Sequence, residues 1–348
     1  MVERDRKAAS RRSSRRAPVR GRELADPAAA ARRAAERADR VSAGLEELDR
    51  WLLDQIRGGL AALEHAGYPH VDRMAARMVD AQAPGVASML RAIPGELAGS
   101  GWPERVLEHL AGIHLLVKAN ERLAELPPEL RATVRSRIGY PIAKADVLSA
   151  PGVSDRWLAV GLIDTVEFRL ESRRVWLYGL TTGRWALWLN FAPPGGYLDT
   201  SVMPGDALDA TLHFYPGSGQ YRALIGRPVV IDLPADQTGA PAGETLADVQ
   251  RRFAELLAAD PWATRMPAVI ESVPIVRGGG DSWLLRDRAG AACELGAASG
   301  EPWPLLAQSG GEPVPVFGEW DGRALRPLSV LAGDHGQPAP TAGYGRAA

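Results

Sequence analysis

Residues 174–191 read RVWLYGLTTGRWALWLNF, two apolar runs rich in tryptophan and leucine on either side of a short polar loop. Aromatic and β-branched residues favour strands, and a loop of this length can join two strands as a hairpin. Both faces of each run are apolar, which predicts a central position in a sheet. The stretch therefore places a β region in the second half of the chain.

The composition changes near Pro151, which separates this β region from an alanine-rich first half. Before Pro151, apolar residues recur every three or four positions, a spacing typical of amphipathic helices. One such stripe runs from Leu45 to Leu63 and predicts a single helix, although Gly58-Gly59 weakens its interior. Later stripes are separated by proline and glycine, so the first half is predicted to be an antiparallel helical array.

Further short runs after residue 200 predict more strands, among them 305–307, 314–320 and 324–330. One amphipathic helix is predicted at 245–259, and its apolar stripe is suited to cover one side of a sheet. The short strands after it, joined by glycine-rich turns, predict a small barrel or sandwich. The sequence thus predicts a multidomain α+β protein with a helical array, a mostly antiparallel β region and one covering helix.

A chain of 348 residues exceeds what one hydrophobic core usually organises. The predicted parts are a disordered basic tail at 1–22, a helical domain at 23–151, a β-sheet domain at 152–265 that includes the helix at 245–259, a small β subdomain at 266–331 and a disordered tail at 332–348.

The composition is that of a globular protein, with 46% hydrophobic and 24% charged residues. Its apolar runs are shorter than the roughly 18 residues that suggest a membrane span, and the amino terminus lacks the apolar segment of a secretory signal. Cys293 is the single cysteine, so a disulfide within the chain cannot form. These features predict a cytoplasmic protein.

The charge is unevenly distributed. Residues 1–22 carry nine Lys or Arg against two acidic residues, a net charge of +7, so the rest of the chain carries about −8 to give the total of −1. Two interpretations of this tail remain open: a solvated linker, or a polyanion contact through Arg11, Arg12, Arg15 and Arg16. No aromatic residue lies among these arginines, so base stacking is not expected.

The glycine clusters and histidine pairs of the sequence lack the spacing that the catalytic and metal-binding motifs they approach require. Gly217-Ser218-Gly219 lacks the spacing of a nucleophile elbow, and Gly278-Gly279-Gly280 lacks the lysine of a phosphate loop. Two pairs of histidines stand five residues apart, which puts the members of each pair on different sides of a helix. We therefore predict no catalytic residue, no metal ligand and no cofactor.

Ten tryptophans raise the question of an aromatic recognition surface. Trp176 and Trp185 lie within apolar strands, where core packing is expected. Trp262, Trp303 and Trp320 each adjoin proline or glycine-rich turns. These three form the candidate interaction surface.

The strings LEELDRWL at 45–52 and MAARMVDAQAPG at 74–85 carry a resemblance to known proteins. They resemble the region downstream of the zinc finger in bacterial SWIM zinc-finger family proteins. Shorter strings continue the resemblance in the same order, so that it spans roughly residues 24–330: LPPEL at 126–130, DRW at 155–157, GRWAL at 183–187, FYPG at 214–217, EWDG at 319–322 and RPLSV at 326–330.

The chain departs from this family in the finger itself. A SWIM site is a C-x-C pair followed by a C-x-H pair, and neither pair occurs here. Cys293 matches no part of that motif, so no zinc ligand is carried over, and zinc would be expected only with a finger upstream. We therefore expect a chain that begins after the finger, which is then encoded upstream, encoded separately or lost.

The resemblance implies a non-catalytic protein-interaction module, accessory to a system of a MoxR-type AAA ATPase and a von Willebrand A-domain protein. The alternative is a nucleic-acid-binding accessory protein that uses the basic tail, although the acidic remainder of the chain disfavours it. An enzyme of unknown class is a third hypothesis, for which the sequence does not supply a nucleophile, a base and an oxyanion donor together.

Overall fold

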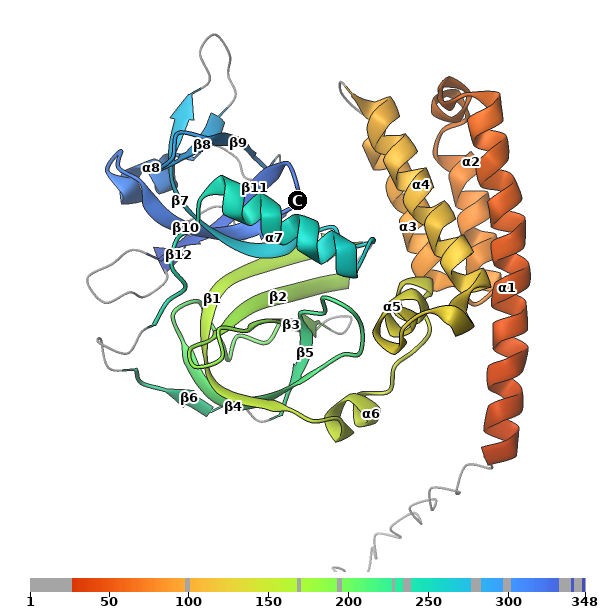
Figure 1. The fold of residues 1–348 in the computed structure, drawn as a ribbon, viewed down its shortest axis with the longest axis horizontal. Helices are drawn as coiled ribbons and strands as arrows, with labels where there is room; N and C mark the ends of the chain where they lie inside the picture. The colour runs from red at the N-terminus through yellow and green to blue at the C-terminus, as the bar shows by residue number, and fades with distance from the viewer. Residues whose placement is uncertain are drawn as a thin grey trace, which may run out of the picture.

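The computed structural model describes residues 27–97, 101–167, 170–192, 196–226, 229–233, 239–276, 283–296, 302–331, 339–340 and 346–347. Helices make up the first part and two β-sheets the second, with further helices between strands (Figure 1). The predicted α+β class is confirmed. The four tail arginines Arg11, Arg12, Arg15 and Arg16 lie outside the described residues.

The helical part is built around one hydrophobic core, to which several helices contribute. We call residues 27–138 the helical bundle. Its elements, followed by one short helix, are α1 (Pro27–Gly58), α2 (Leu60–Asp80), α3 (Pro84–Glu96), α4 (Trp102–Glu121), the 3-10 helix η1 (Leu123–Glu125), α5 (Pro128–Ile138) and α6 (Lys144–Ser149).

The single helix predicted over 45–63 is wrong, because α1 ends and α2 begins on either side of Gly59. Gly59 has a φ of 85°, a left-handed backbone conformation that a helix cannot continue through. Leu52 and Leu63 nevertheless share the bundle core, so the apolar stripe is divided between two packed helices. A second glycine with positive φ, Gly67, kinks α2 without ending it.

The helix α3 approaches the end of α5 closely at two glycines. A Cβ atom on Gly85 in α3 would overlap the carbonyl oxygen of Arg137 in α5, and one on Gly139 would lie 2.6 Å from the Gly85 nitrogen. Gly139 ends α5 with a φ of 107°, which also favours glycine. The helix α3 thus meets the end of α5 at Pro84-Gly85, its first two residues.

The first sheet begins four residues after α6 ends and is mostly antiparallel. Its order is β13-β1-β2-β3-β5-β4-β6, and β1 also pairs with β4, so the ladder returns on itself. The hairpin at 174–191 is present as β2 and β3, with Val175 opposite Trp188 and β3 between β2 and β5. The strands are β1 (Val153–Glu167), β2 (Leu170–Gly179), β3 (Trp185–Phe191), β4 (Ala207–Phe214), β5 (Arg222–Ile225), β6 (Val229–Ile231) and β13 (Arg346–Ala347).

The second sheet has the order β10-β7-β8-β9-β11-β12, and pairing of β10 with β11 closes five strands into a barrel. We call these five strands the second barrel. The elements are β7 (Met266–Val276), β8 (Trp283–Asp287), β9 (Ala292–Leu295), β10 (Val314–Trp320), β11 (Ala324–Val330) and β12 (Ala339–Pro340). Residues 339–340 pair with β11, and residues 346–347 pair with β1. Both segments fall within the tail that was expected to be disordered.

Residues 305–307, predicted as a strand, lie instead in the helix α8 (Trp303–Ser309). Pro304 occupies its first turn, where proline is tolerated, and Gly310 ends it with a φ of 60°. The residues between them favour helix. The sequence therefore contains both end signals of a helix, whereas its short apolar run by itself is equally compatible with a strand.

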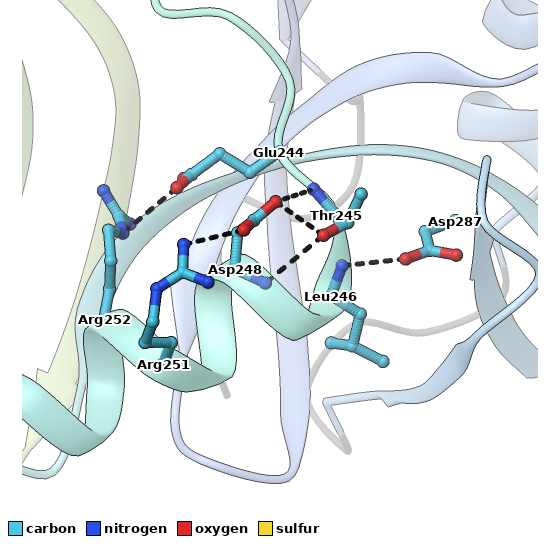
Figure 2. A network of polar contacts seen from close by, with 7 residues as sticks. All are labelled: Glu244, Thr245, Leu246, Asp248, Arg251, Arg252 and Asp287. Atoms are coloured by element: carbon cyan, nitrogen blue, oxygen red, sulfur yellow. Dashed lines mark hydrogen bonds and ion pairs between the residues drawn. The ribbon is translucent and has the colours of Figure 1, made fainter.

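The helix predicted at 245–259 is α7 (Leu246–Ala259). A capping box fixes its start, since Thr245 Oγ1 accepts from the Asp248 amide at 3.3 Å and Asp248 Oδ2 accepts from the Thr245 amide at 3.4 Å (Figure 2). The Thr245 hydroxyl also donates to Asp248 Oδ2 at 2.6 Å. The Leu246 amide donates to Asp287 Oδ2 in β8 at 2.8 Å. The apolar side of α7 packs into the core of the second barrel. The covering helix thus belongs to the second barrel, whereas the predicted division grouped it with the first sheet.

The two β units pack against each other through an apolar cluster. Val160 and Trp176 of the first sheet meet Phe317 and Leu328 of the second barrel there. The Ser329 hydroxyl also donates to the carbonyl oxygen of Val160. Among the helices described, none has the combination of length and apolar character that crossing a membrane requires.

Candidate functional site

The helical bundle meets the β region through the segment that follows α7. Trp262 is buried in the bundle core, and its Nε1 donates to the carbonyl oxygen of Gly112 in α4 at 2.9 Å. Asp260 receives a hydrogen bond from Arg137 Nη2 in α5 at 2.8 Å, and it also accepts from the Trp262 amide at 3.0 Å. One short segment therefore joins two bundle helices to the second barrel.

A cleft of about 380 Å³ lies beside this joint. Met89, Phe253, Leu257 and Trp262 supply apolar walls, and Arg323 reaches Glu108 at 3.1 Å across the two parts. Arg323 and Glu108 are both largely exposed, so this ion pair contributes little to stability.

The three candidate tryptophans are not brought together. Trp320 is 1% exposed in the core of the second barrel, and Trp262 is buried as described above, so neither offers a free surface. Trp303 is 55% exposed and lies edge-on to Trp283, with 5.1 Å between the ring centroids. The sequence could not separate these cases, because each tryptophan adjoins a similar turn.

A buried carboxylate with several arginines forms the densest charge cluster found in the described parts of the chain. Glu319 in β10 is 1% exposed, because it faces the first sheet while the next residue, Trp320, faces the barrel core. Its Oε1 accepts a hydrogen bond from Trp176 Nε1 at 3.0 Å. Its Oε2 lies 3.3 Å from both Arg174 Nη2 and Arg265 Nη1.

Arg326 adds a third guanidinium beside Glu319. It lies directly opposite Glu319 in the β10–β11 ladder, and cross-strand neighbours project from the same face. Burial lowers the pKa of Arg326, while the nearby Glu319 acts to raise it. Within the described residues, the Nε and Nη2 atoms of Arg326 are buried and have no hydrogen-bond partner. We call Arg174, Arg265, Arg326 and Glu319 the arginine junction.

A cavity of about 220 Å³ opens at the arginine junction. Its walls come from the end of α5, the strands β2, β3 and β5, the residues after α7, and β10. Arg137 and Arg222 also line it, the former paired with Asp260 and the latter stacked over the Tyr215 ring at 4.2 Å. The cavity thus lies where the bundle, the first sheet and the second barrel meet.

A second feature is an exposed apolar strip between α1 and α4. Asp49 fixes the register of these helices, since its carboxylate lies 2.6 Å from His114 Nδ1 and 2.9 Å from Lys118 Nζ. Burial acts to raise the pKa of Asp49, but the hydrogen bonds from Lys118 and His114 lower it overall. The cluster therefore holds an ionised Asp49 between the two helices.

The register places apolar residues next to this cluster. The helices α1 and α4 run antiparallel in Figure 1. Residues one and two turns after Asp49 in α1 therefore face residues one and two turns before His114 in α4. Leu53 is 40%, Ile56 45% and Leu107 49% exposed, and Ala111 is also exposed. We call Leu53, Ile56, Leu107 and Ala111 the α1/α4 seam.

The described residues include no group of three or more His, Cys, Asp or Glu placed to hold a metal ion. Cys293 is buried in the second barrel, and burial raises the pKa of its thiol to about 12. A thiol with this pKa is a poor nucleophile at neutral pH.

Sequence reasoning did not find the arginine junction or the α1/α4 seam. The junction joins residues from three separate strands and the segment after α7. Arg174, Glu319 and Arg326 begin the strings at 174–191, 319–322 and 326–330, but no feature of these strings indicates that the three residues meet. The sequence does not reveal the seam because Ile56 and Leu107 belong to the same periodic apolar pattern as the core residues. Their exposure depends on which helices pack around them.

Comparison with known protein families gives a match over residues 36–138, to a family described as the SWIM-associated four-helix bundle domain. These residues run from within α1 to the end of α5 and form such a domain. The resemblance drawn from the sequence is supported over that part of the chain. Comparisons with curated proteins and with solved structures gave no match.

Proposed function

We propose that this protein is a non-catalytic interaction module whose helical bundle binds a protein partner through the α1/α4 seam. The observation that carries the proposal is the seam itself, three large apolar side chains that are exposed at facing positions of α1 and α4 on a SWIM-associated bundle. Single exposed apolar residues are ordinary, whereas a contiguous group on two helices is typical of an interaction surface.

The partner we propose is a MoxR-type AAA ATPase, acting with a von Willebrand A-domain protein, because the family resemblance implies that association. The seam is an exposed apolar surface shared by two helices, against which an apolar helix face of the ATPase can pack. Full burial of a Leu or Ile side chain contributes about 1.5–3 kcal/mol, so each half-exposed seam residue would contribute about 1 kcal/mol. Three such residues contribute about 3 kcal/mol, so polar and apolar contacts around the seam must supply the rest of the binding free energy.

The experiment measures the affinity of the purified full chain for a purified MoxR-type ATPase from the same organism, with and without a von Willebrand A-domain protein. The double variant Ile56→Asp/Leu107→Asp places two charges in the seam, so we expect binding to weaken at least about tenfold. Val79→Asp is the matched control, because Val79 is 46% exposed on α2, outside the seam.

Circular dichroism confirms that each variant is folded before its affinity is compared. Absence of binding to either protein at low and at physiological salt would contradict the proposal. Equal weakening by the seam variant and the Val79 control would also contradict it, since the seam would then not be the contact.

A further inference from the structure

The arginine junction carries more positive charge than its own carboxylate can balance. Arg174, Arg265 and Arg326 surround Glu319, which leaves a surplus of two positive charges among these four described residues. Arg137 does not change this balance, because Asp260 pairs with it. Arg222 at the cavity wall adds a further positive charge.

This surplus stands out against the rest of the protein, since residues 23–348 together carry about −8. Charges removed from water are costly unless they are paired, and arginine clusters are the usual protein sites for phosphate groups. The β10–β11 ladder sets Arg326 directly opposite Glu319, so that the two side chains project from the same face, and the Arg174 and Arg265 guanidinium groups are held by Glu319 Oε2. The junction is therefore organised before any ligand arrives.

The cavity beside the junction is large enough for such a ligand. At about 220 Å³ it has room for several water molecules, each of which takes up about 30 Å³ in the liquid. The Gln220 and Thr264 side chains and the Tyr221 ring also line it, so neutral hydrogen-bonding groups are present besides the arginines. Openings of this kind between domains are favoured positions for small-molecule sites.

We propose that this cavity binds a phosphate group of a small molecule, with Arg174, Arg265 and Arg222 as its cationic contacts and Arg326 as a supporting charge behind them. A phosphate dianion offsets two of the three surplus positive charges, and the guanidinium fork suits the tetrahedral oxygens of phosphate. Because the walls come from three parts of the fold, the bound anion would tie the bundle to both β units. The site is separate from the α1/α4 seam and does not depend on partner binding.

The test titrates the full chain with inorganic phosphate at constant ionic strength, with isothermal calorimetry and the thermal midpoint as readouts. We expect saturable binding and a rise in the midpoint. Arg265→Gln removes one cationic contact without emptying the core, and it should weaken phosphate binding about tenfold. Arg91→Gln is the matched control, because Arg91 is paired with Asp72 within the bundle, outside the cavity lining.

A second variant tests the same charge balance in the opposite direction. Glu319→Gln keeps an oxygen for Trp176 but removes the negative charge, so phosphate should bind several-fold more tightly. Malonate serves as a dicarboxylate of equal charge, and tighter binding of malonate than of phosphate would overturn the assignment to phosphate. Non-saturable binding, or equal affinity in Arg265→Gln and Arg91→Gln, would overturn the site itself.

Discussion

At the scale of single residues, Asp155 in β1 shows how one carboxylate fixes a loop. Its Oδ2 accepts hydrogen bonds from the Thr182 amide at 2.8 Å and the Thr182 hydroxyl at 2.7 Å, and its Oδ1 accepts from the Thr181 amide at 3.1 Å. Burial acts to raise the pKa of Asp155, but these hydrogen bonds outweigh it and lower the pKa overall. The loop between β2 and β3 is therefore held by an ionised side chain of a neighbouring strand.

Asp155→Asn should destabilise the protein by about 2–3 kcal/mol, because an amide cannot accept all of these bonds. The effect should depend on pH. Since the folded-state pKa of Asp155 is depressed, its contribution is complete above the ordinary pKa of 3.8 and is lost as pH falls through the lower folded value. Urea unfolding of both proteins between about pH 7 and pH 3 measures this.

The difference in unfolding free energy between the native chain and Asp155→Asn should shrink below about pH 4. Asp206→Asn is the control variant. The Asp206 carboxylate also accepts a hydrogen bond within a turn, but among the described residues this is a single bond, from the Met203 amide. A difference that is constant over the whole pH range would show that Asp155 does not act through its charge.

At the scale of elements, the packing of α3 against the end of α5 depends on the two glycines that let the backbones touch. Gly85→Ala should cost about 1–3 kcal/mol, because its Cβ would meet the Arg137 carbonyl, which belongs to backbone and cannot move aside. The midpoint of thermal unfolding, followed by circular dichroism at a helical wavelength, measures the loss.

Gly112→Ala is the matched control within the same bundle. A Cβ there would meet no atom within 4 Å of those described, and Gly112 lies in the middle of α4. Alanine should therefore stabilise α4 by about 0.5–1 kcal/mol through helix propensity. Shifts of the same sign for both variants would show that the close approach of α3 and α5 does not control stability.

At the scale of the whole molecule, Trp262 couples the helical bundle to the β region. Trp262→Phe removes the hydrogen bond to Gly112 but keeps most of the buried ring, so it should cost about 1 kcal/mol. Trp262→Ala should cost about 3–5 kcal/mol and empty part of the bundle core. Differential scanning calorimetry on the full chain should then resolve two transitions in place of a single one.

Arg323→Gln gives the control for this interface, since it breaks only the exposed pair with Glu108 and should change stability by less than about 0.5 kcal/mol. A calorimetric profile for Trp262→Ala that is shifted but still a single transition would show that other contacts hold the two parts together.

The sequence by itself determined most of the elements, because their signals are local. The stripe in α4, the Thr245 capping box of α7 and the hairpin at 174–191 are readable from spacing and residue type. The helix α8 differs from the predicted strand because a short apolar run fits both structures. The predicted helix is divided at Gly59 because Gly59 adopts a left-handed backbone conformation, which glycine permits but does not require.

Only the tertiary structure decided which side chains meet. Glu319 and Arg326 lie opposite each other in the β10–β11 ladder. Arg174 contacts Glu319 from another sheet, and Arg265 contacts it from the segment after α7. Likewise, Trp262 and Trp303 each follow a proline in the sequence, yet Trp262 is buried and Trp303 is exposed. Secondary structure follows the periodicity of neighbours in the chain, whereas burial and charge pairing follow from how distant segments pack.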